Sequence, residues 1–186
     1  ALYAALSVGV WALQMSGAFF LPMPFSDPVI WHAHEMIFGF VMAIVAGFLL
    51  TAVANWTGGA PARQIHLAGL CVLWFAGRVA VNMETNLFIA AVIDLAFIPA
   101  LTISLALPLL KSWNKRNFVF LCMLTSLFLC NASLYIWQDR TALYVAIIII
   151  ITMISLVGGR IIPAFTVGAL RRKGLERHIK DQPRMD

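Results

Sequence analysis

The chain has 186 residues, of which 62% are hydrophobic and only 11% are charged, and its formal net charge is +5. A soluble globular domain carries about 25% charged residues, so a chain of this composition needs lipid to cover its apolar surface. The composition therefore predicts a polytopic membrane protein and excludes a single soluble domain. The basic residues are concentrated in a few connections, so the charge bears on membrane orientation, and we expect no nucleic-acid partner.

Six apolar segments are long enough to provide the roughly 20 helical residues that cross a bilayer. We therefore expect an all-α transmembrane bundle with helices at about residues 2–21, 31–53, 65–83, 86–110, 117–137 and 141–162. In this prediction residues 1–170 form the membrane domain. Residues 171–186 form a basic cytoplasmic tail, or a linker to a second half that lies outside this sequence. The first residue lies inside an apolar run and is not methionine, so we expect a fragment of a longer protein.

The distribution of Lys and Arg among the connections predicts the orientation. The connections after the first, third and fifth helices contain one basic residue, Arg140. The connections after the second and fourth helices and the tail contain ten: Arg63, Lys111, Lys115, Arg116, Arg171, Arg172, Lys173, Arg177, Lys180 and Arg184. We therefore expect both ends of the chain on the cytoplasmic side of a bacterial inner membrane, with the start of the second helix at the periplasmic face.

Two of the four histidines and a carboxylate lie together at the start of the second helix, in Trp31-His32-Ala33-His34-Glu35. Ionisable groups are costly in lipid, so such a cluster indicates a functional site. Neutral imidazole suits copper, iron and zinc, which makes His32 and His34 candidate metal ligands. Residues two apart on a helix point about 200° apart, so the two rings either serve two sites or lie in an irregular first turn. The alternative is that both are interfacial polar residues that cap the helix.

Glu35 begins a stripe of small residues that continues at Gly39, Ala43 and Gly47. Small residues at this spacing allow another helix, or a flat cofactor ring, to approach closely. His32 is three residues before Glu35, so we expect both side chains on this face.

Arg78 and Asp94 are ionisable residues in the third and fourth predicted helices. Their depths differ by about 4–5 Å at 1.5 Å per residue, which an arginine side chain can span. One interpretation is an Arg78–Asp94 ion pair. The other is that Arg78 binds an anionic group, such as a haem propionate, at the level of the histidines.

The sixth predicted helix ends in Gly158-Gly159-Arg160-Ile161-Ile162-Pro163. Two glycines loosen a helix, and proline removes a backbone donor and clashes one turn back. Irregular backbone at membrane depth is tolerated only against protein or a wet cavity. The motif therefore predicts a packed or ligand-lining bend, where Arg160 either contacts a cofactor or extends to the cytoplasmic surface. We expect His66 and His178 to be interfacial and solvated, respectively.

With these motifs, the chain resembles the NnrS family of bacterial membrane proteins. The resemblance rests on His32-Ala33-His34-Glu35-Met36 with Phe38-Gly39-Phe40, on Ala76-Gly77-Arg78, on Asp94 and on the Gly158–Pro163 motif. It implies a haem- and copper-containing inner-membrane protein of about twelve helices, associated with nitric oxide metabolism and resistance to nitrosative stress. It also implies that this chain is roughly the N-terminal half.

The first functional hypothesis is a haem and copper site at the periplasmic edge that binds or processes nitric oxide or a related small molecule. His32 and His34 would be metal ligands, Glu35 would orient an imidazole or handle protons, and Arg78 and Arg160 would bind the cofactor. The lipid bilayer and the missing half would be the other partners. If the protein is an enzyme, these metals indicate a redox reaction. The intramembrane charges also fit a proton-coupled transporter, and a non-catalytic assembly or sensor subunit is the third hypothesis.

Overall fold

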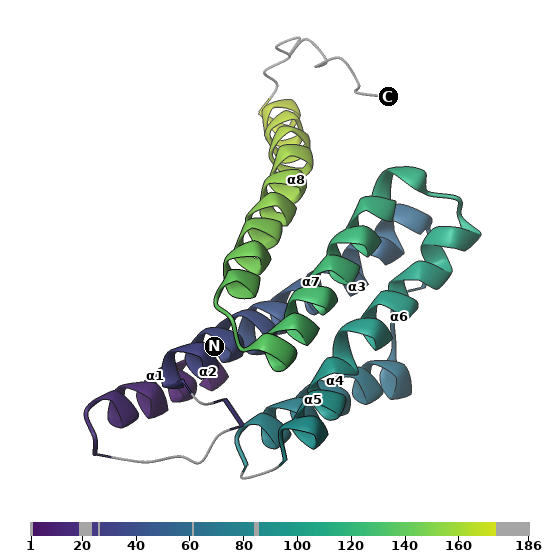
Figure 1. Cartoon of the computed structure of the whole chain (residues 1–186). Coiled ribbons are helices and arrows are strands. Elements are labelled where there is room, and N and C mark those ends of the chain that lie inside the picture. Colours follow the sequence, from purple (N-terminus) through teal and green to yellow (C-terminus); the bar gives the residue numbers. More distant parts are fainter. Residues whose placement is uncertain (1, 19–23, 26, 61, 84–85, 174–186) are drawn as a thin grey trace. The chain divides into compact units, whose positions relative to one another are not determined.

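The computed structural model describes residues 2–18, 24–25, 27–60, 62–83 and 86–173. These residues form helices and no strand, which confirms the predicted all-α class (Figure 1). The helices are α1 (Leu2–Met15), α2 (Pro28–His34), η1 (Glu35–Val41), α3 (Met42–Thr57), α4 (Gln64–Val81), α5 (Leu87–Leu95), α6 (Phe97–Lys111), η2 (Lys115–Asn117), α7 (Phe118–Trp137) and α8 (Thr141–Arg172). The chain divides into two compact units, residues 1–149 and 150–186, and α8 begins in the first.

Five stretches of the described chain are long and apolar enough to cross a membrane: Pro28–Thr57, Gln64–Val81, Leu87–Lys111, Lys115–Trp137 and Thr141–Leu170. They fit the predicted multi-pass membrane protein. The first predicted helix differs, because α1 has 14 residues and extends only about 21 Å, against about 30 Å of bilayer hydrocarbon. The prediction that this helix runs through residues 16–18 is wrong, since the chain turns there with Gly17 at a φ of 73°. Positions 19–21 lie outside the described residues.

The sixth helix extends past its predicted end at residue 162, and the predicted bend there stays a prediction. α8 stays helical through Gly158, Gly159 and Pro163 and ends at Arg172. Transmembrane helices tolerate a proline inside the helix. The predicted basic tail therefore begins inside the helix, and residues 174–186 lie outside the described residues.

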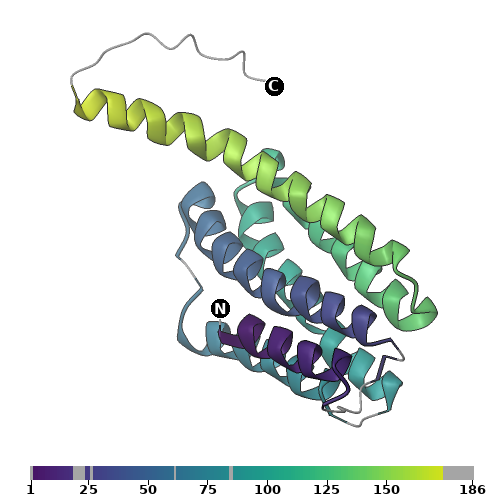
Figure 2. The same ribbon diagram turned by 90° about the vertical axis from the view of Figure 1, so that its left-hand side faces the viewer.

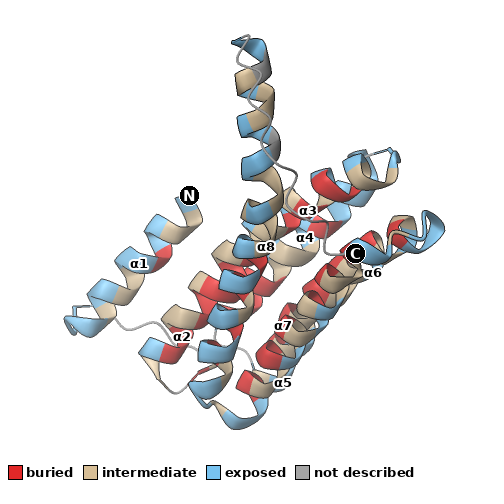
Figure 3. Cartoon of the chain, turned by 90° about the horizontal axis from the view of Figure 1, so that it is seen from above, coloured by how far each residue is buried: buried red, intermediate tan, exposed pale blue. Residues whose placement is uncertain are grey.

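Leucine side chains of α3, α6 and α7 form the core of the first unit. α6 packs against both α3 and α7, and the buried faces of these helices turn toward one another (Figure 3). The leucines that are at most 2% exposed are Leu49, Leu101, Leu105, Leu109, Leu124, Leu127 and Leu134. α1 contacts α2 and η1 and lies beside the helix that they begin (Figure 2).

Two local irregularities shape the membrane helices near the candidate site. The helix that starts at Pro28 contains a π-helical segment, η1, between α2 and α3. Such wider turns occur frequently at functional sites, and here the indole N–H of Trp74 donates to the carbonyl of Gly39 at 2.9 Å. The fourth predicted helix is interrupted at Ala96, because Pro99 has no N–H and its ring clashes with the carbonyl of Leu95. The interruption lies just beyond Asp94.

Asp27 joins the start of α2 to the turn before α8. Its carboxylate accepts from the backbone N–H of Val29 at 2.8 Å, which caps the helix that Pro28 begins. It also accepts from the guanidinium of Arg140 at 2.6 Å. Two of the connections predicted on the same membrane side therefore meet at one end of the bundle.

We predict that Gly77→Ala lowers stability, whereas Gly47→Ala does not. A Cβ at Gly77 would lie 3.2 Å from the Cα of Asp94 and 3.1 Å from its Oδ1, so α4 and α5 would have to separate. Overpacking of this kind costs about 1–3 kcal/mol. A Cβ at Gly47 meets nothing within 4 Å, and alanine there favours the helix by about 0.5–1 kcal/mol. Thermal unfolding in detergent measures both, and equal midpoint shifts would contradict the close α4–α5 contact.

The Asp27–Arg140 pair predicts a pH dependence of stability. The hydrogen bond from Arg140 lowers the pKa of Asp27, and the backbone N–H of Val29 acts in the same direction. A carboxylate with a lowered pKa stabilises the fold above its ordinary pKa of about 4, and this contribution is lost as pH falls through the lowered value. Asp27→Asn keeps a helix cap without the charge. The difference in thermal midpoint between wild type and Asp27→Asn should therefore shrink from about pH 6 to about pH 3. A difference in thermal midpoint that does not change with pH would disprove the stabilising role of the Asp27 charge.

Candidate functional site

The imidazole of His34 is fully buried and surrounded by polar side chains from three other segments. Its Nδ1 lies 3.0 Å from Oε1 of Glu35. Its Nε2 lies 3.1 Å from Oδ2 of Asp94 and 3.1 Å from Oδ1 of Asn131. Both ring nitrogens are therefore engaged by protein groups from η1, α5 and α7.

The guanidinium of Arg78, only 5% exposed, lies between the two carboxylates. Its Nη1 donates to Glu35 and its Nη2 donates to Asp94, which confirms the Arg78–Asp94 ion pair. Gly39 makes this position accessible, because a Cβ there would lie 2.9 Å from Nη1 of Arg78. The small-residue stripe thus admits an arginine at Gly39, while Gly47 faces open space.

Two residues of α7 that the sequence analysis did not single out complete the network. The Asn131 amide donates to Oδ2 of Asp94 at 2.9 Å, and the Tyr135 hydroxyl donates to the same oxygen at 3.1 Å. Both residues are buried. The signal was present in the sequence: an asparagine and a tyrosine four residues apart share one face of an otherwise apolar helix.

From these contacts we infer two protons on the His34–Glu35 pair, one on Nε2 of His34 and one that the two residues share. Nε2 of His34 faces two acceptors and must carry a hydrogen, because the opposite orientation of the Asn131 amide would set its oxygen against the Asp94 carboxylate. Nδ1 and the Glu35 carboxylate then share a second proton. With that proton, Arg78, Asp94, His34 and Glu35 sum to zero charge, which avoids the cost of an unpaired charge in a buried site.

His32 lies in different surroundings. α2 is a regular helix through both histidines, so the two rings diverge, as expected for residues that serve two sites. The His32 ring stacks on Trp11 of α1, with ring centroids 4.5 Å apart and planes 19° apart. Its buried Nδ1 has no hydrogen-bond partner within the part of the chain that the structure describes. Glu35 contacts the imidazole of His34, next to it in the sequence.

Metal-ligand geometry separates the two histidines. Among the described residues, no group of three or more His, Cys, Asp or Glu side chains is arranged to hold a metal ion. The nitrogens of His34 are engaged, whereas His32 has one that is unoccupied. Arg160 lies on α8 in the second unit. The assignments of metal or cofactor contacts to these residues, and to Glu35 and Arg78, stay predictions.

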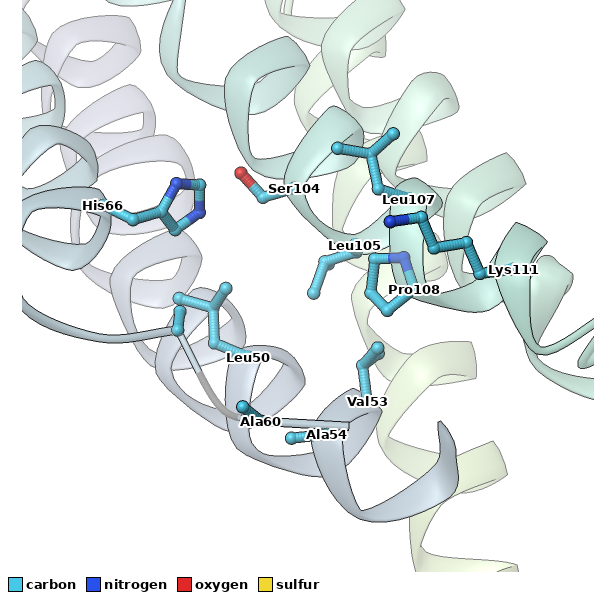
Figure 4. Close-up of a pocket in the computed structure, with 11 residues that line it drawn as sticks. Leu50, Val53, Ala54, Ala60, His66, Ser104, Leu105, Leu107, Pro108 and Lys111 are labelled. Carbon is cyan, nitrogen blue, oxygen red and sulfur yellow. The ribbon is translucent and has the colours of Figure 1, made fainter. Parts of the chain in front are cut away.

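A cavity of about 260 Å³ opens at the opposite end of the bundle, between α3, the start of α4 and α6 (Figure 4). Its walls are mostly apolar, and the polar side chains around it are His66, Ser104 and Lys111. His66 is in the first turn of α4 and exposed, as predicted, while Arg78 lies in the last turn. The cavity is therefore separate from the His34 network.

Comparison with protein families gives a match over residues 1–186 to the family described as NnrS protein. Comparison with curated proteins and with solved structures gives no match.

We predict a strong coupling between Arg78 and Asp94. Arg78→Met leaves an unbalanced buried carboxylate and should cost about 3–5 kcal/mol. The double variant Arg78→Met/Asp94→Leu restores neutrality, so its loss should be smaller than the sum of the two single losses. Thermal unfolding of the four proteins in detergent measures the coupling.

The control for this cycle is Tyr135→Phe, which removes one of the hydrogen bonds to Asp94 and leaves the charges balanced. It should cost about 1.5–3 kcal/mol, because the lost bond is to a charged group. Strictly additive losses for Arg78→Met and Asp94→Leu would show that the charges are not coupled.

Proposed function

The chain belongs to the NnrS family, and on that premise we propose that it is the haem-binding part of a membrane protein of nitric oxide metabolism or nitrosative-stress resistance. The family resemblance supports the role. One observation supports His32 as the residue that binds the iron. Its buried Nδ1 has no hydrogen-bond partner among the described residues.

An imidazole that binds iron needs a nitrogen lone pair that no protein group occupies. His32 meets this requirement, and its stacking on Trp11 limits the rotation of its ring. His34 does not meet it, since Glu35, Asp94 and Asn131 engage both nitrogens. We therefore propose that His32 would be the residue that holds the haem. Bound haem would supply an iron atom that binds nitric oxide and exchanges electrons.

In this proposal the network around His34 is the support of the site. It ties η1 to α4 through Arg78 and ties α2 to α5 and α7 through Asp94 and Asn131. His32 is half-buried on the same short helix as His34, so the network fixes the position of the ligand. Arg78 pairs with Glu35 and Asp94, which gives it an internal role instead of contact with a propionate. The His34–Glu35 pair holds a proton near the site.

Copper is expected from the resemblance, but the described side chains do not fit it. A copper site at His34 would need a nitrogen that is not already engaged, and the described residues provide no cluster of three ligands. The proposal therefore assigns no step to copper.

The proposal places the site at the periplasmic face of a bacterial inner membrane. The ten basic residues of the even-numbered connections and the tail support a cytoplasmic position for both ends. The Asp27–Arg140 contact agrees with the first and fifth connections lying on one side of the membrane, and the basic residues alone support which side that is.

A proton-coupled carrier is the second candidate. It is favoured by a specific observation, the neutral network in which His34 and Glu35 share a proton within the membrane-spanning helices. Substrate flux into proteoliposomes made from haem-free protein would favour this candidate over the first.

Haem content of the purified full-length protein tests the proposal. His32→Ala should lose most of the haem per folded protein, while His66→Ala, at the other end of the bundle, keeps it. Free imidazole should restore the Soret band of His32→Gly, because it replaces the missing ligand. His34→Gln should keep its haem wherever it folds. The assignment is wrong if His32→Ala binds haem normally and folded His34→Gln does not.

A further inference from the structure

The short helix α1 turns its polar side chains inward. Tyr3, Ser7 and Trp11 follow each other at four-residue spacing on its buried or half-buried face, and Ser7 is only 5% exposed. The outer face is apolar, with Leu2 75%, Leu6 60% and Leu13 50% exposed. Exposed and less exposed residues alternate along α1 in Figure 3. Leucine therefore faces the lipid, and hydroxyl and indole groups face the bundle. This pattern indicates that the bundle interior beside α1 is polar.

All three inward side chains carry buried donors that have no hydrogen-bond partner among the described residues: the Tyr3 hydroxyl, the Ser7 hydroxyl and the indole N–H of Trp11. A buried unpaired donor costs about 1–3 kcal/mol, and native proteins contain few of them. Three on one face of one helix are better explained by a polar occupant than by a dry contact.

Neighbouring helices also place polar groups beside the inward face of α1. Nδ1 of His32, beside Trp11, is unpartnered in the described chain. At the other end, Tyr3 packs on the ring of Trp74 with centroids 5.5 Å apart and lies against Gly39, where Arg78 enters the bundle. The Nε of Arg78 is a further buried donor without a partner in the described ranges. We call the four side chains of Tyr3, Ser7, Trp11 and His32 the α1 seam.

The chemistry of these atoms selects the occupant. An anion would add an unbalanced charge beside a network that is already neutral, and a lipid chain would leave every donor unpaired. A metal ion needs acceptor ligands, and the seam offers one nitrogen. Water accepts from the hydroxyl and indole donors and donates to the His32 nitrogen, so it satisfies all of them.

We propose that the α1 seam is a water-filled path. It connects the periplasmic face of the membrane to the Arg78 end of the network and carries protons to and from the His34–Glu35 pair. The pair releases its shared proton along hydrogen-bonded waters to bulk water. A proton that returns along the same path restores the neutral network, so no oxidant or reductant takes part. This inference rests on the Tyr3, Ser7 and Trp11 donors, which have no partner in the described chain whether iron or water occupies Nδ1 of His32.

Cysteine accessibility tests the path, because a thiol reacts with charged methanethiosulfonates as its thiolate, which forms only where water reaches it. Ser7→Cys is introduced into the full-length protein with Cys71, Cys122 and Cys130 replaced. Two controls are Leu6→Cys on the lipid side of α1 and Ala46→Cys, which is 7% exposed within α3. Ser7→Cys should react at least about tenfold faster than both controls with the ethylammonium reagent added from the outer side. Reaction as slow as that of Ala46→Cys would overturn the proposal.

Removal of the donors gives a second test that needs no reagent. In a dry contact, Ser7→Ala and Trp11→Phe would remove unpaired polar groups, and the thermal midpoint would rise by several degrees. In a hydrated seam the donors are satisfied by water, so the midpoint should stay the same or fall. Val10→Ala, on a neighbouring apolar position of α1, controls for changes in helix packing. A clear rise in both donor variants would refute a water-filled seam.

Discussion

The fold depends on keeping one guanidinium charge balanced inside a membrane protein. Arg78 is only 5% exposed in α4 and binds Glu35 of η1 and Asp94 of α5. Two carboxylates exceed one guanidinium, so the network also needs the proton that His34 and Glu35 share. Asn131 and Tyr135 fill the remaining positions around Asp94. Five helical segments are therefore held together by the requirement that a buried cluster be neutral, with both carboxylates hydrogen-bonded.

Local backbone features make this cluster sterically possible. Gly39 leaves room for the arginine side chain, and Gly77 lets α5 approach until the Cα of Asp94 nearly touches α4. The π-helical turn from Glu35 joins α2 to α3 within one continuous helix, and Pro99 ends α5 just after Asp94. The same short helix, α2, points His34 into the network and His32 toward α1. It therefore carries both the histidine that supports the site and the histidine with an unoccupied nitrogen.

The sequence predicted the helical class and most of the spans, because apolar stretches of membrane length are unambiguous. It also predicted the Arg78–Asp94 pair, since an intramembrane arginine needs a nearby acid. It did not separate the roles of His32 and His34, because the pattern does not show which helix faces each ring. Asn131 and Tyr135 were missed for the same reason. α8 continues as helix past the Gly158–Pro163 motif, and α1 proved shorter than its apolar stretch, because the chain turns after Met15.

The central claim is that His34 is a protein-bound, proton-sharing member of a neutral network and not a metal ligand. An experimental structure of the metal-loaded, full-length protein in lipid, detailed enough to orient the ring, tests it most directly. Our account predicts the imidazole of His34 between Glu35 and Asp94, with Arg78 bound to both carboxylates. Density for a metal ion on either nitrogen of His34, or an Arg78 side chain turned away from both acids, would contradict it.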